Sequence, residues 1–248
     1  MKKLLTTGAI WLALTTSGLS GTGGTHWGYS GTVAPEYWGE LDPAYRLCKT
    51  GKNQSPIDIN EDNTVKACLK PIKFSYANDA KSIVNNGHTV KVKSKGKSYI
   101  LVDGKKFTLR QFHFHAPSEH TLNGEHFPFE AHFVHTDEKG NIAVVGVFFK
   151  VGKENPEIAK LWSSLPSTVN QEALLKEEIN FKNLLPKKKD YYRYSGSLTT
   201  PPCSEGVRWF VLKEPVELSQ KQLEEFKRVM GVNNNRPVQP VNARKVLK

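Results

Sequence analysis

Short runs of alternating or β-branched residues dominate the chain and predict a protein built mainly of strands. The runs cover residues 82–84, 89–93, 98–102, 108–115, 130–135, 142–150 and 207–212. Turns such as Asp103-Gly104 and Asn123-Gly124 separate them. Residues 143–149 are apolar at every position, which predicts a central strand covered on both faces. We therefore expect a mainly β fold: a single domain on a large, mostly antiparallel central sheet with peripheral short helices.

Two segments carry the boundary signals of helices. Asn155 can cap a helix that has Pro156 at its first position and runs to about Leu165. Ser219 and Gln222 have the spacing of a capping box, and Gly231 stands where that second helix would stop.

The N-terminal residues have the pattern of an export signal. Lys2 and Lys3 precede an apolar stretch over residues 4–14, and small residues follow at 18–20. The stretch is too short to span a bilayer, so we expect residues 1–20 to be a signal peptide and the protein to be periplasmic or secreted. An uncleaved anchor is the alternative. The Gly- and Thr-rich residues 21–25 are expected to form a flexible linker before a folded domain at 26–248.

Export makes the three cysteines informative. In an oxidising compartment they allow one intramolecular bridge and leave one thiol over. The spacing of Cys48, Cys68 and Cys203 does not say which two pair. The remaining thiol would be free or would join two chains.

Composition and charge exclude some classes of protein. With 38% apolar and 24% charged residues, the 248-residue chain can bury a core, and we expect no membrane span. The formal charge of +11 falls to +9 without the signal peptide, because Lys2 and Lys3 are removed. Alternating lysines at 91, 93, 95 and 97 predict a solvated strand face or a blunted edge. No nucleic-acid-binding motif accompanies the charge, so we expect no nucleic-acid partner.

The candidate chemistry lies in Gln111-Phe112-His113-Phe114-His115 and Glu130-Ala131-His132. Residues i and i+2 of a strand project from one face, so His113 and His115 can bind one ion that His132 of a neighbouring strand completes. Three imidazoles with an open fourth position are typical of a catalytic zinc site.

Gln111 and Glu130 each stand two residues before one of these histidines, where they can accept its second ring N–H. The alternative is three histidines that only pack in the core. No His-Glu-x-x-His motif is present, so a helical zinc-protease site is not supported.

At these residues the chain resembles the α-class carbonic anhydrases, from His26 to the C-terminus, and in particular their exported bacterial members. The segments that carry the resemblance are His26-Trp27-Gly28-Tyr29, Asn53-Gln54-Ser55-Pro56-Ile57-Asp58-Ile59, Asn85-Asn86-Gly87-His88, Gln111-Phe112-His113-Phe114-His115, Ser118-Glu119-His120-Thr121, Glu130-Ala131-His132-Phe133-Val134-His135 and Gly196-Ser197-Leu198-Thr199-Thr200-Pro201-Pro202-Cys203. The resemblance implies that residues 26–248 form a catalytic domain that reversibly hydrates carbon dioxide to bicarbonate and a proton. It also implies Zn²⁺ as the cofactor, held by the three histidines named above.

The resemblance also implies catalytic roles for three other residues. Thr199 and Glu119 match a hydroxyl and a buried carboxylate that orient the metal-activated nucleophile. Without the resemblance, Glu119 would be read as a carboxylate that caps a turn. His88 matches the histidine that exports the proton, a role suited to an imidazole near neutral pH. Its alternative is a turn histidine with no role.

Further positions match the cavity of the family. Those that match substrate-binding positions are Val134, Val144, Leu198, Thr199, Thr200, Val207 and Trp209. The apolar members of this set are also compatible with plain core. Those that match the proton-relay water network are Tyr29, Asn86 and Thr200. Lys91 falls where several relatives carry a smaller polar residue.

The other histidines are not expected to bind metal. His120 matches a buried position that bonds toward Tyr194, and His135 lies on the strand face opposite His132. His26 and His126 are expected at the surface.

Cys48 and Cys203 match the disulfide of exported members, and Cys68 has no matching partner. We expect Cys68 to link subunits of a homo-oligomer, either a dimer or a tetramer. Three rival functions remain: a non-catalytic relative that uses the cavity as a binding module, a zinc esterase, and a polyanion-binding β protein with incidental histidines.

Overall fold

The computed structural model describes residues 25–248, so the expected signal peptide and residues 21–24 of the expected linker lie outside the described residues. Thr25, the last residue of that linker, packs against the domain: its hydroxyl donates to Asp42, and its carbonyl accepts from the Tyr45 hydroxyl at 3.0 Å. None of the helices between residues 25 and 248 is long and apolar enough to cross a membrane.

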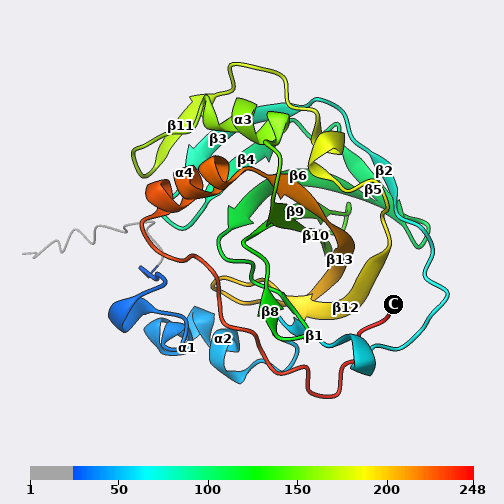
Figure 1. Cartoon of the computed structure of the whole chain (residues 1–248). Coiled ribbons are helices and arrows are strands. Elements are labelled where there is room, and N and C mark those ends of the chain that lie inside the picture. The colour runs from blue at the N-terminus through cyan, green and yellow to red at the C-terminus, as the bar shows by residue number, and fades with distance from the viewer. Residues whose placement is uncertain (1–24) are drawn as a thin grey trace, which may run out of the picture.

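A strongly curved ten-stranded sheet forms the body of the domain (Figure 1). In spatial order its main path is β11 (Gln171–Leu174), β3 (Ala80–Asn85), β4 (Val90–Ser94), β6 (Lys105–His115), β9 (Phe129–Thr136), β10 (Ile142–Val151), β13 (Glu205–Leu218) and β12 (Tyr191–Ser197). Off this path, β5 (Tyr99–Val102) pairs with β6 and with β2 (Lys73–Ser75). Of the pairs described in this sheet, β10–β13 alone is parallel. The predicted mainly β, mostly antiparallel architecture is confirmed.

A small second sheet consists of β1 (Asp58–Ile59), β7 (Thr121–Leu122) and β8 (Glu125–His126). The predicted central strand is confirmed in β10, which lies between β9 and β13 and is buried from Ala143 to Phe149. Its apolar character at every position follows from this placement, because both faces are covered.

The two predicted helices are confirmed. In α3 (Pro156–Trp162) the Asn155 side chain accepts from the backbone N–H groups of Glu157 and Ile158, and the helix ends three residues earlier than predicted. In α4 (Gln220–Met230) both bonds of the Ser219–Gln222 capping box are present. Gly231 follows with a φ of 69°, a left-handed conformation that favours glycine.

The remaining helices are single turns. Two α-helical turns, α1 (Trp38–Leu41) and α2 (Leu47–Thr50), lie in the N-terminal segment, at a distance from α3 and α4 (Figure 1). The 3₁₀ turns are η1 (Gly31–Val33), η2 (Pro43–Tyr45), η3 (Glu61–Asn63) and η4 (Phe181–Leu184).

The two faces of the sheet bury different sets of side chains. On one face Phe112 and Phe114 of β6 join the large core under α3 and α4. A smaller core on the other face includes Val144 and Trp209. Because side chains alternate along a strand, His113 projects away from the large core, toward the face that carries the cavity described below.

A disulfide between Cys48 and Cys203 joins α2 to the turn after β12, with 5.0 Å between the Cα atoms. This confirms the pairing that the family resemblance implies. Cys68 is free and exposed.

Candidate metal centre

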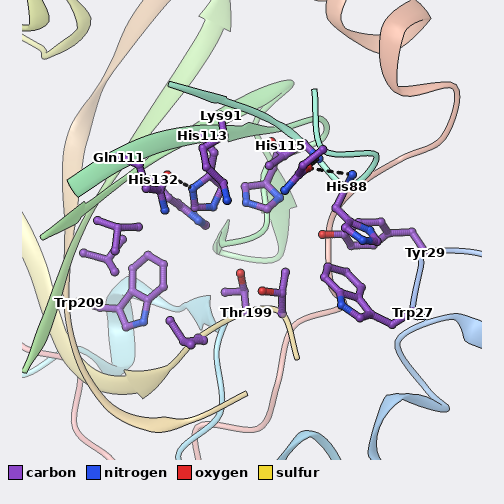
Figure 2. A pocket seen from close by; sticks show the side chains of 16 residues that line it. Trp27, Tyr29, His88, Lys91, Gln111, His113, His115, His132, Thr199 and Trp209 are labelled. Atoms are coloured by element: carbon purple, nitrogen blue, oxygen red, sulfur yellow. Dashed lines mark hydrogen bonds between the residues drawn. The ribbon is translucent and has the colours of Figure 1, made fainter. Parts of the chain in front are cut away.

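His113, His115 and His132 meet on one face of the sheet. His113 lies directly opposite His132 in the β6–β9 pair, and His115 follows two residues along β6. One ring nitrogen of each lies within 4.8 Å of the other two. Figure 2 shows the three rings side by side, with Thr199 facing them across a cavity.

The other ring nitrogen of each histidine faces a fixed acceptor. His113 Nδ1 lies at hydrogen-bond distance, 2.8 Å, from Gln111 Oε1. His132 Nε2 lies 2.9 Å from Glu130 Oε1, a close ion-pair contact whose alignment does not meet the criteria of a hydrogen bond. These are the two partners predicted from the sequence. A ring N–H that donates to such an acceptor fixes the tautomer and turns the opposite nitrogen toward the ion. His113 Nε2 and His132 Nδ1 are therefore the nitrogens available to a metal.

The acceptor for His115 was not predicted. His115 Nδ1 lies 2.7 Å from the backbone carbonyl oxygen of Asn234, 119 residues away. No local sequence signal identifies a backbone oxygen at that separation. His115 Nε2 is buried and has no hydrogen-bond partner among residues 25–248, as expected of a nitrogen that is free to bind a metal ion.

Glu130 organises the next layer of the site. Its Oε1 also accepts from His120 Nδ1 at 2.8 Å, and its Oε2 accepts from two backbone N–H groups. Burial opposes ionisation of Glu130, but His120 and His132 outweigh it and hold the pKa of Glu130 well below its usual range. The expected contact of His120 is confirmed: its Nε2 lies 2.6 Å from the Tyr194 hydroxyl.

The surroundings of the three histidines affect their pKa values in ways that favour the binding of a cation. Burial, reinforced by the neighbouring histidines and Lys91, lowers the pKa of His113 well below its usual value, and burial also lowers the pKa of His115. Burial acts in the same direction on His132, but the Glu130 carboxylate outweighs it and raises the pKa of that ring. A metal ligand must be a neutral imidazole, and the same carboxylate charge favours a cation bound to the opposite nitrogen. The donor set therefore fits Zn²⁺.

Glu119 lies beside this centre and is fully buried. Its Oε1 accepts from the backbone N–H of Arg236 at 2.9 Å. Its Oε2 lies 3.5 Å from His115 Nε2 and 3.7 Å from His132 Nδ1, and has no hydrogen-bond partner within residues 25–248. No bond joins it to Thr199 in the described part of the chain, so the catalytic pairing of these two residues stays a prediction.

Arg236 is a residue that the sequence did not reveal. Arg236 is 1% exposed, and its guanidinium donates to the Cys48 and Ser55 carbonyls and to Gln54 Oε1, each at 2.8 or 2.9 Å. Its backbone thus holds Glu119 while its side chain holds the segment that begins at the disulfide.

A cavity of about 240 Å³ opens over the three histidines. Its lining residues are Trp27, Tyr29, Asn86, His88, Thr89, Lys91, Gln111, His113, His115, His132, Val134, Val144, Leu198, Thr199, Thr200 and Trp209. All the predicted substrate-binding and water-network positions except Val207 belong to this lining. Val207 is buried and packs in the smaller core with Val144 and Trp209, which both line the cavity, so its part in substrate binding stays a prediction.

His88 lies at the cavity wall in the turn between β3 and β4. The Asn86 side-chain oxygen accepts from the backbone N–H groups of His88 and Thr89, at 3.0 and 2.8 Å, so Asn86 also shapes the turn. Burial, followed by the charges of His26 and Lys91, lowers the pKa of His88, which favours the neutral, proton-accepting form.

Two lining residues correct or extend the predictions. Trp27 stacks on His88, a role that the sequence did not indicate. The predicted solvated or edge position of the alternating lysines was wrong for Lys91, because β4 is an interior strand between β3 and β6 and Lys91 faces the cavity. Lys95 and Lys97 lie beyond the end of β4 and are exposed.

His26 and His126 are exposed as expected, and His135 faces the large core, where its Nε2 lies 2.9 Å from the Tyr76 hydroxyl.

Comparison with known proteins agrees with this geometry. The family model of eukaryotic-type carbonic anhydrases matches residues 33–248. A carbonic anhydrase of Neisseria gonorrhoeae is 48% identical over 224 residues, which cover 90% of this chain and 88% of that protein. The α-carbonic anhydrase of Thermovibrio ammonificans, solved with the inhibitor sulfanilamide, is 65% identical with a TM-score of 0.90, over 91% of this chain and all of that one. The α-carbonic anhydrase of Photobacterium profundum is 49% identical with a TM-score of 0.85, over 90% of this chain and all of that one.

Proposed function

Because the chain belongs to the eukaryotic-type, or α-class, carbonic anhydrases, we propose that it hydrates carbon dioxide reversibly at a zinc ion held by His113, His115 and His132. The observation that carries this proposal is the convergence of one nitrogen from each ring within 4.8 Å, while the other nitrogen of each ring faces a fixed acceptor. A zinc ion bound by these residues would supply a nucleophile at neutral pH, because it would lower the pKa of a water molecule to about 7, the value known for carbonic anhydrases themselves.

Thr199 and Glu119 are proposed to orient the attack. Glu119 is buried, its Oε1 is held by the Arg236 N–H, and its Oε2 is available as an acceptor. A Thr199 hydroxyl that donates its proton to this oxygen can only accept from the nucleophile, which aims a lone pair of the nucleophile at the substrate. Thr199 is 5% exposed and lines the cavity opposite the three rings, which suits this role (Figure 2).

An apolar wall is proposed to receive the substrate. Val134, Val144, Leu198 and Trp209 line the cavity beside the histidines. Carbon dioxide is small and carries no net charge, so it needs a dry apolar surface beside the reacting centre rather than a polar clamp. These side chains also exclude water from the place where the substrate would be attacked.

His88 is proposed to carry the proton out. Its neutral imidazole can take a proton at one ring nitrogen and release it to buffer at the cavity mouth. Tyr29, Asn86 and Thr200 line the same cavity as His88 and the three proposed metal ligands. The buried Tyr29 hydroxyl has no partner within residues 25–248, as suits a group that holds a water molecule of the relay.

We also propose that the protein is exported, to the periplasm or outside the cell, and that it forms a homo-oligomer. The Cys48–Cys203 disulfide supports export, since such bridges persist in oxidising compartments. The exposed Cys68 is proposed to join two subunits. Non-reducing electrophoresis of the Cys68→Ser variant tests this link, and a band pattern equal to that of the unchanged protein contradicts it.

The rival functions make different demands on the site. A non-catalytic binding module does not need three metal histidines, yet all three are present and converge. A zinc esterase would use the same centre but would prefer an activated ester to carbon dioxide. A polyanion-binding protein with incidental histidines would not need the fixed acceptors at the second ring nitrogens.

Stopped-flow measurement of carbon dioxide hydration, before and after chelation and again after Zn²⁺ is restored, tests the proposal. We expect one zinc per chain, loss of hydration with the metal and recovery with Zn²⁺. The matched variant is His132→Ala, which should fail to recover, with His126→Ala as an exposed control. Hydration that survives complete metal removal, or a higher efficiency on an activated ester, contradicts the proposal.

A further inference from the structure

Lys91 brings a positive charge to the wall of the cavity. In the β4–β6 pair Lys91 lies directly opposite His113. Side chains directly opposite each other in an antiparallel pair project from the same face, with Cβ atoms about 4.5–5.5 Å apart. Lys91 therefore points to the same side of the sheet as the metal ligand and lines the same cavity (Figure 2).

The ammonium group of Lys91 has no carboxylate partner within residues 25–248. The acid nearest in register is Glu172, which lies across β3 on β11, opposite Val84. Glu172 is already engaged: Lys93 Nζ lies 2.6 Å from its Oε2, and the Ser82 hydroxyl donates to its Oε1. Because Lys93 is paired with the Glu172 carboxylate, the positive charge of Lys91 has no compensating negative charge nearby among the described residues.

A half-buried lysine without a carboxylate partner is an unusual feature of a folded protein. A half-buried charge loses hydration, and a protein ordinarily pairs such a group or places it in open solvent. Burial and the charge of Lys93 lower the pKa of Lys91, which reflects this loss. Lys91 also contributes to the lowered pKa of both His88 and His113, so its charge is felt across the cavity.

We propose that Lys91 is an anion-binding residue of the cavity, which holds bicarbonate or another small oxyanion beside the metal centre. The proposal rests on the proposed function, because bicarbonate is the product of that reaction. An ammonium group offers three donors to the oxygens of an anion, and charge-assisted bonds of this kind are stronger than neutral ones. Carbon dioxide has no net charge and gains little from the same group. Lys91 therefore raises the affinity of the cavity for the anionic product and for anionic inhibitors and has little effect on its affinity for carbon dioxide.

Anion titration of the cobalt-substituted protein tests the proposal. The probes are bicarbonate and formate, and the readout is the visible absorption of Co²⁺, which changes when an anion enters the site. Lys91→Gln should weaken binding of both anions about fivefold, the size expected when one charge-assisted contact in a partly solvated cavity is lost. Lys91→Arg, which keeps the charge, should stay within about twofold of the unchanged protein.

The matched control is Lys93→Gln, which removes a lysine of the same strand face that is paired with Glu172. Its anion affinity should equal that of the unchanged protein. The difference between Lys91→Gln and the unchanged protein should shrink as salt rises, because added ions screen the charge. Equal anion affinity for Lys91→Gln and Lys93→Gln overturns the proposal.

A second readout is independent of the variants. In zinc-loaded protein labelled with ¹³C at lysine Cε, bicarbonate should move the Lys91 resonance and leave that of Lys93 unmoved. An unmoved Lys91 signal overturns the proposal even if Lys91→Gln does not load metal. If Lys91→Gln hydrates carbon dioxide more slowly in dilute buffer while its anion affinity is unchanged, Lys91 is a proton carrier and the anion-binding proposal is overturned.

Failure of the proposed carbon dioxide hydration and failure of the proposed role of Lys91 give different experimental results. If the unchanged, metal-loaded protein does not hydrate carbon dioxide, the proposed function fails. If it does, and the anion constants do not respond to Lys91, only the role of Lys91 fails.

Discussion

Trp27 lies flat against His88, with ring centroids 3.7 Å apart and planes that differ by 10°. The contact joins the first described residues of the domain to the turn between β3 and β4, at the wall of the cavity. Trp27 is itself packed edge-on against Trp38 of α1, which fixes its position. The N-terminal segment therefore sets the place of the imidazole that we propose as the proton carrier.

Replacement of His88 tests that role. His88→Ala should reduce the maximal rate of carbon dioxide hydration at least about tenfold in dilute buffer, because no side chain then relays the proton. Added imidazole should restore most of the rate. His26→Ala is the matched control, since His26 is an exposed histidine whose charge also acts on His88. Equal rates for His88→Ala and the unchanged protein in dilute buffer would remove the assignment.

Replacement of Trp27 should move the pKa of His88. Burial is the first cause that lowers this pKa, so Trp27→Ala should raise it toward the usual 6.5. Trp27→Phe keeps an aromatic face and should cause a smaller rise. The His88 ring-proton resonance, followed by NMR against pH, gives both values. Because only the neutral ring accepts a proton, the pH at which dilute-buffer turnover is half-maximal should rise by the same amount. A pKa that does not respond to Trp27→Ala contradicts the prediction.

Thr199 should affect the rate without affecting the metal. Thr199→Ala removes the hydroxyl proposed to bond Glu119 Oε2 and should lower kcat/KM for carbon dioxide about a hundredfold, the usual loss for one oriented hydrogen-bonding group. Thr199→Ser keeps the hydroxyl and should retain most of the activity. Zinc content, measured on all three proteins, should be equal. A loss of zinc in Thr199→Ala would show that the residue supports the metal site instead.

The Cys48–Cys203 bridge should contribute strongly to stability. It closes a loop across a sequence separation of 155 residues. The chain-entropy account gives at most about 5 kcal/mol of unfolding free energy for a loop of this size. Urea unfolding of the Cys48→Ser/Cys203→Ser pair should show this loss. Both the test and reference proteins should carry Cys68→Ser, so that links between chains do not contribute. A midpoint equal to that of the reference would refute the prediction.

His135 should make the protein less stable in acid. Burial lowers its pKa from the usual 6.5 to about 3. The unfolded chain therefore takes up a proton as pH falls below 6.5 while the folded chain does not, so stability is complete above that value and falls toward pH 3. Between about pH 6 and about pH 4, the unfolding free energy of the unchanged protein should fall about 1.4 kcal/mol more per pH unit than that of His135→Gln. Both proteins keep the same metal ligands, so the effect of zinc release cancels. Parallel slopes would contradict the assignment.

Local pattern was enough to locate the proposed metal ligands and their first partners. Side chains two apart on a strand share a face, so His113, His115, Gln111 and Glu130 could be placed without knowledge of the sheet. The caps of α3 and α4 follow in the same way from residues within one turn. In contrast, β12 was not predicted, because Tyr191–Ser197 has no clear alternation and becomes a strand through its pairing with β13.

The sequence by itself determined that His113 and His115 share one strand face, because this follows from residue type and a period of two. The roles proposed for His88, Glu119 and Thr199 rest on the family resemblance. The tertiary structure alone decided the rest of the site. The Asn234 carbonyl reaches His115, Arg236 holds Glu119, and Lys91 turns into the cavity only because distant segments pair in one register. Such contacts depend on how the whole sheet packs, and no short stretch of the chain encodes them.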